Sequence, residues 1–407
     1  MTRSGDDHER GATAGSPART WGLVGGASLI SAGLAAYEIV PASVTPLLRD
    51  SLGVGPTAAG LVVGVMFGTA VVTSLPAGAV LNRTNARTAV AVAVLALFLA
   101  GVWGWVAARR GEYWSLIASR AVGGVAFVVV WNAGIDIVSR AVPADARATA
   151  VGAFTASGPV GFALGQAAGP VVAGRLGWPA IFVVFTGIAF AGFVAFWPLS
   201  RGFGDRGGDA PSPRELGAVF RNRSVWLVGA LGFLGYALYL FVNSWGSSYL
   251  TEAVGLSLGL SGLVLSAFPG VGVVSRVSGG VLSDRVFGGR RRPVLLASFC
   301  GAGPLLVAFT SLRSPVLLVA VLLFAGFAIQ LTLGLSFTYV REVVEPRVAA
   351  TAVAFLTSVG LAGAFLAPIA GGALIERAGY GPAFLVASAL AVCGAVLAWW
   401  APEPAAR

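Results

Sequence analysis

The stretch Gly280-Val-Leu-Ser-Asp284-Arg285 ends one long apolar run, and Gly78-Ala-Val-Leu-Asn82-Arg83 ends another that lies half a chain earlier. In each copy a polar residue stands four positions after the glycine, and an arginine follows it. Further arginines precede the next apolar run, Arg87 in the first copy and Arg290 and Arg291 in the second. A motif that recurs once at corresponding places indicates an internal duplication and predicts two equivalent halves.

The composition predicts a membrane protein. Of the 407 residues, 57% are hydrophobic and only 11% are charged, whereas a soluble domain carries about 25% charged residues. The apolar runs exceed the roughly 20 residues that a helix needs to cross a bilayer. Glycine and proline inside such runs are common in transmembrane helices. The predicted fold class is therefore an all-α polytopic membrane protein.

The breaks between apolar runs divide the chain into twelve predicted transmembrane helices. They are placed at 21–48, 56–81, 87–108, 113–139, 148–173, 178–199, 224–250, 257–283, 293–312, 315–340, 349–374 and 380–401. The longest polar connection separates six spans from six. The predicted organisation is a tail (1–20), a first six-helix half (21–199), a linker (200–223), a second six-helix half (224–401) and a C-terminal tail (402–407).

The basic residues predict the orientation of these helices. All 27 are arginine, and most lie in the tails and in the loops that follow the even-numbered spans. The positive-inside rule then places both termini, and both copies of the loop motif, in the cytoplasm. We expect a multi-pass protein of the plasma membrane.

Several classes of site are not expected. The net charge of +10 is explained by the loop arginines, so nucleic acid is not an expected partner. The only histidine, His8, lies in a polar tail, and Cys300 and Cys393 lie far apart in apolar runs. We therefore expect no metal site, no cofactor and no enzymatic constellation. A chain without lysine lacks the GxxxxGK[ST] nucleotide loop, which argues against pumping driven by ATP.

Three more matches between the halves occur in the same order along the chain. They pair residues 148–151 with 350–353, 169–174 with 367–372, and 177–182 with 379–384. Two parallel repeats of six spans are typical of transporters whose substrate site lies between the halves, near the middle of the membrane.

The loop motifs resemble those of the major facilitator superfamily. The segment 280–291 looks like the family's cytoplasmic loop motif, with one extra residue before the final arginines. The segment 78–87 looks like its first-half version, but Asn82 and Asn85 stand where the family has Asp and Gly. The resemblance extends over nearly the whole chain, from about Trp21 to about Trp400.

Two helix motifs strengthen the resemblance. The segment 120–124 (RAVGG) looks like the family's fourth-helix motif, and the segment 165–174 looks like its fifth-helix motif associated with antiporters. The resemblance implies the twelve-helix fold of this superfamily, with two six-helix halves that rock about a central cavity.

Glu38 and Arg120 are charged residues well inside predicted spans 1 and 4. At 1.5 Å per residue they lie about 15 Å and about 10 Å from the outer ends of these spans. Ser31, Glu38 and Thr45 recur every seven residues and share one face of span 1. Since the resemblance implies that spans 1 and 4 line the cavity, we expect Glu38 and Arg120 to meet there, and protonation of Glu38 would free Arg120. The alternative is a static ion pair that fixes helix packing.

Other polar and aromatic residues are candidates for the cavity wall. Tyr236, Tyr239 and Asn243 share one face of span 7. Asn243 and Gln330 are favoured because a side-chain amide in lipid needs hydrogen-bond partners, whereas the alternative for the aromatic residues is ordinary packing. The predicted cavity set is Ser31, Thr45, Trp131, Tyr236, Tyr239, Asn243 and Gln330.

The cytoplasmic ends of the spans predict a gate. Asp136 is expected to pair with Arg83 or Arg140 there, and Arg276 is expected to pack at the gate, with anion binding as the alternative. Because the first copy of the loop motif has an uncharged amide where the second has Asp284, the halves are expected to contribute unequally to closure. The predicted gate set is Gly78, Asn82, Arg83, Asp136, Arg140, Arg276, Gly280, Asp284, Arg285, Arg290 and Arg291.

Small residues at four-residue spacing predict close helix contacts in spans 5 and 11. The predicted packing set is Gly161, Gly165, Gly169, Pro170, Gly363, Ala367, Pro368 and Gly371.

The sequence therefore predicts a secondary active transporter of a small solute, working as a monomer in the bilayer with protons as the coupling ion. Export is favoured, because the fifth-helix motif and the Glu38–Arg120 arrangement resemble those of proton-coupled efflux antiporters. One alternative is a proton-coupled uptake symporter or exchanger of an organic anion, which Arg120 and Arg276 would bind. Another is a membrane sensor on the same fold that does not transport.

Overall fold

Helices make up 88% of the residues that the structure describes, and these residues contain no strand. The structure, a computed structural model, describes residues 17–202, 217 and 219–403. At the end of one helix it describes the main chain but not the side chains of Leu75, Gly78, Ala79, Val80, Asn82 and Arg83.

The first half of the chain forms seven helices. They are α1 (Pro17–Ser43), α2 (Thr45–Leu52), α3 (Pro56–Arg83), α4 (Ala86–Arg109), α5 (Tyr113–Ala141), α6 (Arg147–Leu176) and α7 (Ala180–Leu199). The second half forms α9 (Arg223–Glu252), α10 (Leu258–Gly270), α11 (Gly272–Val281), the π-turn η1 (Leu282–Val286), α12 (Arg292–Ser311), α13 (Pro315–Glu342), the 3₁₀ turn η2 (Pro346–Val348), α14 (Ala349–Ala378) and α15 (Tyr380–Trp399).

Eleven helical segments among the described residues are long and apolar enough to cross a membrane. The predicted span that is not among them, 148–173, lies within α6, which has 30 residues but is rich in Gly, Ala, Ser and Thr. The chain is therefore a multi-span membrane protein, while the count of twelve spans stays a prediction.

Two of the predicted spans are not single helices. The span 21–48 is divided at Val44 into α1 and α2, and the span 257–283 is divided at Val271 into α10 and α11. Proline explains both breaks, because it has no N–H to continue the helical hydrogen bonds. Pro46 stands in the first turn of α2, and Pro269 stands in the last turn of α10.

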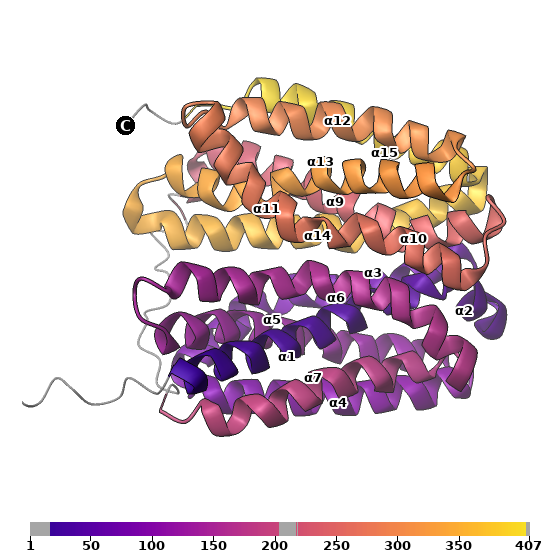
Figure 1. Ribbon diagram of the computed structural model, residues 1–407, viewed down its shortest axis with the longest axis horizontal. Coiled ribbons are helices and arrows are strands. Elements are labelled where there is room, and N and C mark those ends of the chain that lie inside the picture. Colours follow the sequence, from indigo (N-terminus) through magenta and orange to yellow (C-terminus); the bar gives the residue numbers. More distant parts are fainter. Residues whose placement is uncertain (1–16, 203–216, 218, 404–407) are drawn as a thin grey trace, which may run out of the picture.

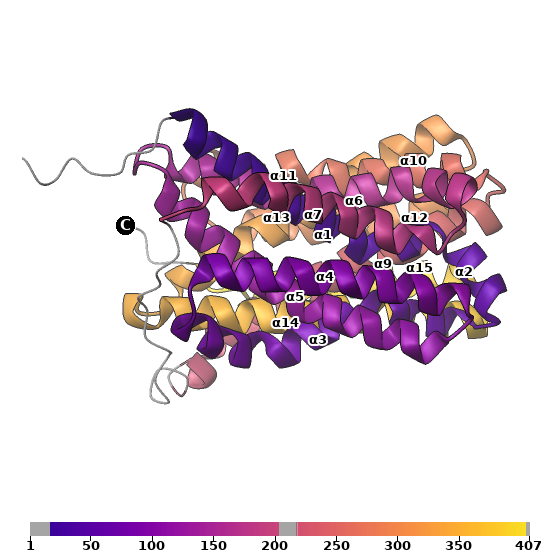
Figure 2. The ribbon, with the colours of Figure 1, turned by 90° about the horizontal axis from the view of Figure 1, so that it is seen from below.

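The helices form two bundles that lie side by side, α1 to α7 in one and α9 to α15 in the other (Figure 1). The same packing recurs in each: α1 packs on α6 and α7 as α9 packs on α14 and α15, and α4 packs on α5 and α7 as α12 packs on α13 and α15. The bundles meet where α3 packs on α14 and α6 packs on α10. Seen from below, the long helices still run along the same axis (Figure 2). A solute site between the bundles would therefore be lined by helices of both.

The crossings between helices use glycine where main chains approach closely. In α6, a Cβ on Gly165 would lie 2.8 Å from the carbonyl oxygen of Ala36, and one on Gly169 would lie 2.7 Å from Cγ2 of Val40. Between the bundles, a Cβ on Gly60 of α3 would collide with the carbonyl of Pro368 in α14. The other predicted packing residues lie at similar crossings or inside α6 and α14: Gly161, Pro170, Gly363, Ala367 and Gly371.

The described chain begins and ends at the same end of the molecule, and α2 lies at the opposite end (Figure 1). This agrees with an even number of crossings. Which end faces the cytoplasm remains the prediction made from the arginines.

Adding one methyl group at Gly161 tests the contact of α6 with α1. A Cβ there would lie 2.7 Å from the Cβ of Ala35 and closer still to the carbonyl of Ala32. We expect Gly161→Ala to destabilise the protein by about 1–3 kcal/mol through overpacking. The apparent melting temperature in detergent should fall by a few degrees.

The control for this experiment is Gly152→Ala, in the second turn of α6, where a Cβ would meet nothing within 4 Å. Alanine favours a helix over glycine by up to about 1 kcal/mol, so this variant should melt at or slightly above the wild-type temperature. Equal melting of the two variants would contradict the close approach.

Candidate functional site

Buried polar side chains gather where the two bundles meet. Glu38 of α1 is 4% exposed, and Gln166 of α6, Asn243 of α9 and Gln330 of α13 are fully buried. Within the described residues one oxygen of each of these four side chains is buried without a hydrogen-bond partner. A polar atom buried in this way is costly in a packed interior. Buried polar oxygens without a partner therefore lie at the bundle interface and beside it.

The amide side chains connect helices across this region. The Nε2 atom of Gln166 donates to the carbonyl of Asn243 at 2.7 Å and thereby joins the two bundles. The amide of Asn243 donates within α9 to the carbonyl of Tyr239, and that of Gln330 donates to the carbonyl of Phe268 in α10 at 3.0 Å. Sequence reasoning missed Gln166, although the argument applied to Asn243 and Gln330, an amide inside an apolar span, would have identified it.

Tyr239 lies at the centre of the interface. Its ring stacks between Phe162 of α6, with 5.4 Å between centroids, and Phe268 of α10, with 5.8 Å. Its hydroxyl is buried beside the side chain of Asn243. Tyr236, one turn earlier on α9, interacts electrostatically with both Glu38 and Arg276. Both predicted tyrosines therefore face the region between the bundles.

Arg120 binds main-chain carbonyls rather than a carboxylate. The fully buried guanidinium donates to the carbonyls of Val62 (3.0 Å), Tyr37 (2.7 Å) and Glu38 (2.6 Å). Pro41 explains why the Tyr37 carbonyl is available, because residue 41 has no N–H to bond the carbonyl four residues earlier. The predicted pairing of the two side chains is thus corrected: Arg120 holds the backbone of Glu38, and its three contacts tie α5 to α1 and α3.

The carboxyl group of Glu38 is enclosed at the contact of α1 with α9. One of its oxygens is buried without a hydrogen-bond partner among the described residues. The side chain interacts electrostatically with Arg120 and with Tyr236 and Tyr239 of α9. The carboxyl group of Glu38 therefore lies at the contact of the bundles, next to a cation that is already bound by carbonyls.

Arg276 does not lie in the gate network that the sequence predicts for it. Its guanidinium lies over the ring of Tyr239, 5.7 Å from the centroid. Within the described residues it makes no ion pair, and its buried Nε atom has no hydrogen-bond partner. Helix α11 thus carries this cation toward the central tyrosine.

The remaining predicted cavity residues make local contacts. Thr45 donates to the carbonyls of Pro41 and Ala42, close to the α1–α2 break. Trp131 packs against Phe154 of α6 within the first bundle. Ser31 is buried on α1, seven residues before Glu38.

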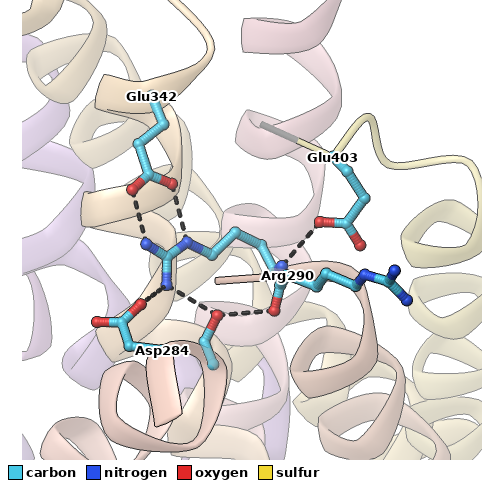
Figure 3. A network of polar contacts seen from close by, with 6 residues as sticks. Asp284, Arg290, Glu342 and Glu403 are labelled. Carbon is cyan, nitrogen blue, oxygen red and sulfur yellow. Dashed lines mark hydrogen bonds and ion pairs between the residues drawn. The ribbon is translucent and has the colours of Figure 1, made fainter. Parts of the chain in front are cut away.

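The second copy of the loop motif forms a network around Arg291 (Figure 3). The guanidinium donates to both carboxylate oxygens of Glu342, at 2.8 and 2.6 Å, and to Asp284 at 2.5 Å and Ser283 at 2.8 Å. The hydrogen bonds to Glu342 raise the pKa of Arg291 above its usual value. The side chain is 7% exposed, so this ion pair is shielded from solvent.

Residues 401–403, which follow α15, bind to the same loop. The Glu403 carboxylate accepts hydrogen bonds from the main-chain N–H groups of Arg291 (2.9 Å) and Arg292 (3.2 Å) at the start of α12. A carboxylate at a helix N-terminus satisfies free N–H groups and complements the helix dipole. Arg292 in turn donates to the carbonyl of Ala401. Glu342 and Glu403 were not predicted, since only the fold brings them to the loop.

The other predicted gate residues are placed as follows. Asp136 pairs with Arg140 one turn later in α5 at 2.5 Å, and the carbonyl of Arg290 accepts from Ser283. Arg285 is exposed, and a Cβ on Gly280 would meet nothing within 4 Å. For Gly78, Asn82 and Arg83 the structure describes only the main chain.

The end of the molecule that contains α2 is tied by polar contacts between the bundles. Arg49 of α2 pairs with Glu252 at the end of α9 at 2.9 Å, and Tyr380 of α15 donates to the same carboxylate. Glu376 of α14 accepts from the hydroxyl and the main-chain N–H of Thr57 in α3. The sequence did not predict this set of contacts, which we call the outer clamp.

Replacing Arg120 by Lys tests its role as a link between helices. An ammonium group lacks the planar fork that reaches three carbonyls, and each lost hydrogen bond from a charged donor costs about 1.5–3 kcal/mol. We expect a clear fall in melting temperature. Arg110→Lys, at a side chain that is 68% exposed, should melt like the wild type; equal stability of both variants would argue that Arg120 acts only as a charge.

Comparison with known proteins agrees with this arrangement. The family model described as Major Facilitator Superfamily matches residues 26–361 and 280–407. The nitrite extrusion protein of Bacillus subtilis is 24% identical over 80% of each chain. The probable sulfoacetate transporter SauU of Cupriavidus necator is 28% identical over 72% of this chain and 79% of that protein.

A solved structure has the same fold. The crystal structure of a bacterial homolog to the human lysosomal transporter Spinster, in an inward-facing and occupied conformation, superposes with a TM-score of 0.80. The identity is 17%, over 95% of this chain and 97% of that one. The protein therefore belongs to the major facilitator superfamily and has the fold of its membrane transporters.

Proposed function

We propose that this protein is a proton-coupled secondary active transporter that moves a small solute through a site between its two bundles. The observation that carries the proposal is the enclosed carboxyl group of Glu38 at the contact of α1 with α9. An ionisable group inside a membrane is costly to maintain and is functional in most cases. No cofactor or catalytic constellation is needed for this activity.

Alternating access would change the environment of Glu38. Its main-chain carbonyl is held by Arg120 within the first bundle, whereas the tyrosines that interact electrostatically with its carboxyl group belong to α9 of the second bundle. When the bundles separate on one side, the solvation of the carboxyl group changes, and its proton affinity changes with it. The same movement exposes the solute site, so proton and solute exchange become linked.

The outer clamp would control opening of the site toward the end of the molecule that contains α2. It joins α2 to α9 and α3 to α14, so it must break when the site opens toward that end. With the loop arginines in the cytoplasm, as the positive-inside rule predicts, the clamp faces the outside. We propose twelve spans in two six-helix repeats, acting as a monomer in the plasma membrane.

Two directions of transport are supported by different observations. The segment 165–174 resembles the fifth-helix motif of antiporters, which favours export. Arg276, a cation without an ion pair in the described site, favours the second candidate, a symporter or exchanger of an organic anion. Nitrite and sulfoacetate, named for two relatives, are anions, and one of those relatives is named as an extrusion protein. The sign of solute flux under an imposed proton gradient separates the two directions.

Replacing Glu38 by Gln should abolish coupling to protons. The amide keeps the shape of the side chain but cannot bind and release a proton. In proteoliposomes with an imposed pH gradient, we expect gradient-driven accumulation of the solute to vanish, while exchange of solute across equal pH persists. Glu112→Gln, at a side chain that is 49% exposed, should retain coupling, and undiminished gradient-driven flux in the Glu38 variant would remove Glu38 from the mechanism.

Neutralising the outer clamp should shift the protein toward opening at that end. Ion pairs with this exposure contribute about 0.2–1 kcal/mol, so Glu252→Gln should raise the open population by up to about five-fold. The background for the measurement carries Cys300→Ser and Cys393→Ser, and spin labels are attached at Asp50→Cys and Ala253→Cys. Double electron–electron resonance then measures the distance between the two labels. The longer distance component should grow.

The control for the clamp is Glu345→Gln, which removes an exposed local pair with Arg347 within the second half. It should leave the distance distribution unchanged. An unchanged distribution in the Glu252 variant as well would show that the Arg49–Glu252 pair does not hold this end closed.

A further inference from the structure

The charges inside the membrane-embedded interface do not balance. Glu38, Arg120 and Arg276 all lie between the bundles or next to them, which gives two cations and one carboxyl group. Arg120 is satisfied by three main-chain carbonyls. Arg276 makes no ion pair within the described residues, and its Nε atom is buried without a hydrogen-bond partner. Unlike Arg120, this partly buried guanidinium is not compensated by carbonyls, so a counter-charge would stabilise it.

The surroundings of Arg276 contain groups suited to an anion. The phenol of Tyr239 lies under the guanidinium, and its hydroxyl is buried beside the side chain of Asn243. Tyr236 is within electrostatic range of the same guanidinium. Both hydroxyls are hydrogen-bond donors, and a guanidinium presents two parallel N–H groups that match the two oxygens of a carboxylate or a similar oxyanion.

Helix α11, which carries Arg276, packs closely against Gln330 of α13. Gly272 lies one turn before Arg276 on α11, and a Cβ there would lie 2.5 Å from Cδ of Gln330. The Gln330 side chain therefore occupies the space beside Gly272, and its amide is tied to the carbonyl of Phe268. Arg276 is thus directed toward Tyr239 by a face of α11 that has little freedom to turn.

We propose that Arg276 and Tyr239 bind the negatively charged oxygens of the transported solute, which is a small organic or inorganic oxyanion. This inference rests on the proposed function, since it assigns the solute class of the same site. The guanidinium supplies the charge and a two-pronged hydrogen bond, and the tyrosine hydroxyl supplies a further donor. Arg120 takes no part in binding, because its guanidinium is fully buried and is held by three main-chain carbonyls.

Binding to the purified protein tests this without any transport. In a neutral detergent, acetate, nitrite and methanesulfonate are titrated against the thermal stability of the wild type, with acetamide as the neutral counterpart of acetate. We expect at least one of the anions to raise the melting temperature in a saturable way, because a ligand that binds only the folded state stabilises it. Acetamide should have no effect.

The variant Arg276→Gln should weaken binding of that anion at least ten-fold, since hydrogen bonds to a charged group contribute about 1.5–3 kcal/mol. Tyr239→Phe removes one hydroxyl and should weaken it several-fold, which keeps the test valid if the Arg276 variant does not fold. Arg276→Lys should recover part of the affinity. Arg110→Gln, at an exposed site, should bind like the wild type.

Other results would overturn the proposal. Equal stabilisation by acetamide and acetate would show that charge is not recognised, and unchanged anion affinity in Arg276→Gln would place the site elsewhere. Stabilisation by phosphatidylglycerol alone, without an effect of any soluble anion, would identify a lipid headgroup as the counter-charge. Anion binding without gradient-driven flux would refute the proposed function but leave the anion site standing. Proton-coupled flux of a neutral solute would support the proposed function but refute the anion site.

Discussion

The arrangement of the site depends on one proline in α1. Pro41 has no N–H, so the carbonyl of Tyr37 is released from the helix and is bound by Arg120, together with the carbonyls of Glu38 and Val62. This network fixes α1 against α3 and α5 and fixes the backbone of Glu38. The carboxyl group is then left to face α9. A charged residue that looks like a functional partner of Glu38 is therefore a structural anchor for it.

Much of the fold could be predicted from the sequence, because the length of the apolar runs and the glycines between them locate the helices. The helices lie close to the predicted spans, and the family assignment from the loop motifs is confirmed. The prediction of single helices at 21–48 and 257–283 was wrong, since run length does not register the breaks at Val44 and Val271. Helix α6 shows a different difficulty. It is as long as its neighbours, but its many small residues lower its hydropathy, so it is not among the segments that are apolar enough to cross a membrane.

The site was predictable only in part, for a physical reason. A buried charge can be recognised from sequence, but its partner depends on which face its helix turns inward and on main-chain atoms that carry no sequence signal. Arg276 was therefore assigned to the gate although it lies over Tyr239, and Arg120 was paired with a carboxylate although it binds carbonyls. Glu403 is more than 100 residues from Arg291, so only the assembled fold reveals their contact.

The glycines at the bundle interface have a kinetic consequence. Gly60 lies against the carbonyl of Pro368, Gly262 against the carbonyl of Gln166, and Gly372 against the carbonyl of Pro56. At these crossings the bundles touch through main-chain atoms, so no side chain has to change rotamer for them to part. Parting there breaks many weak dispersion contacts of about 0.1–0.2 kcal/mol each rather than an interlocked set. The barrier to motion then lies mainly in the outer clamp and in the central contacts of Gln166 with Asn243 and of Phe162 with Tyr239.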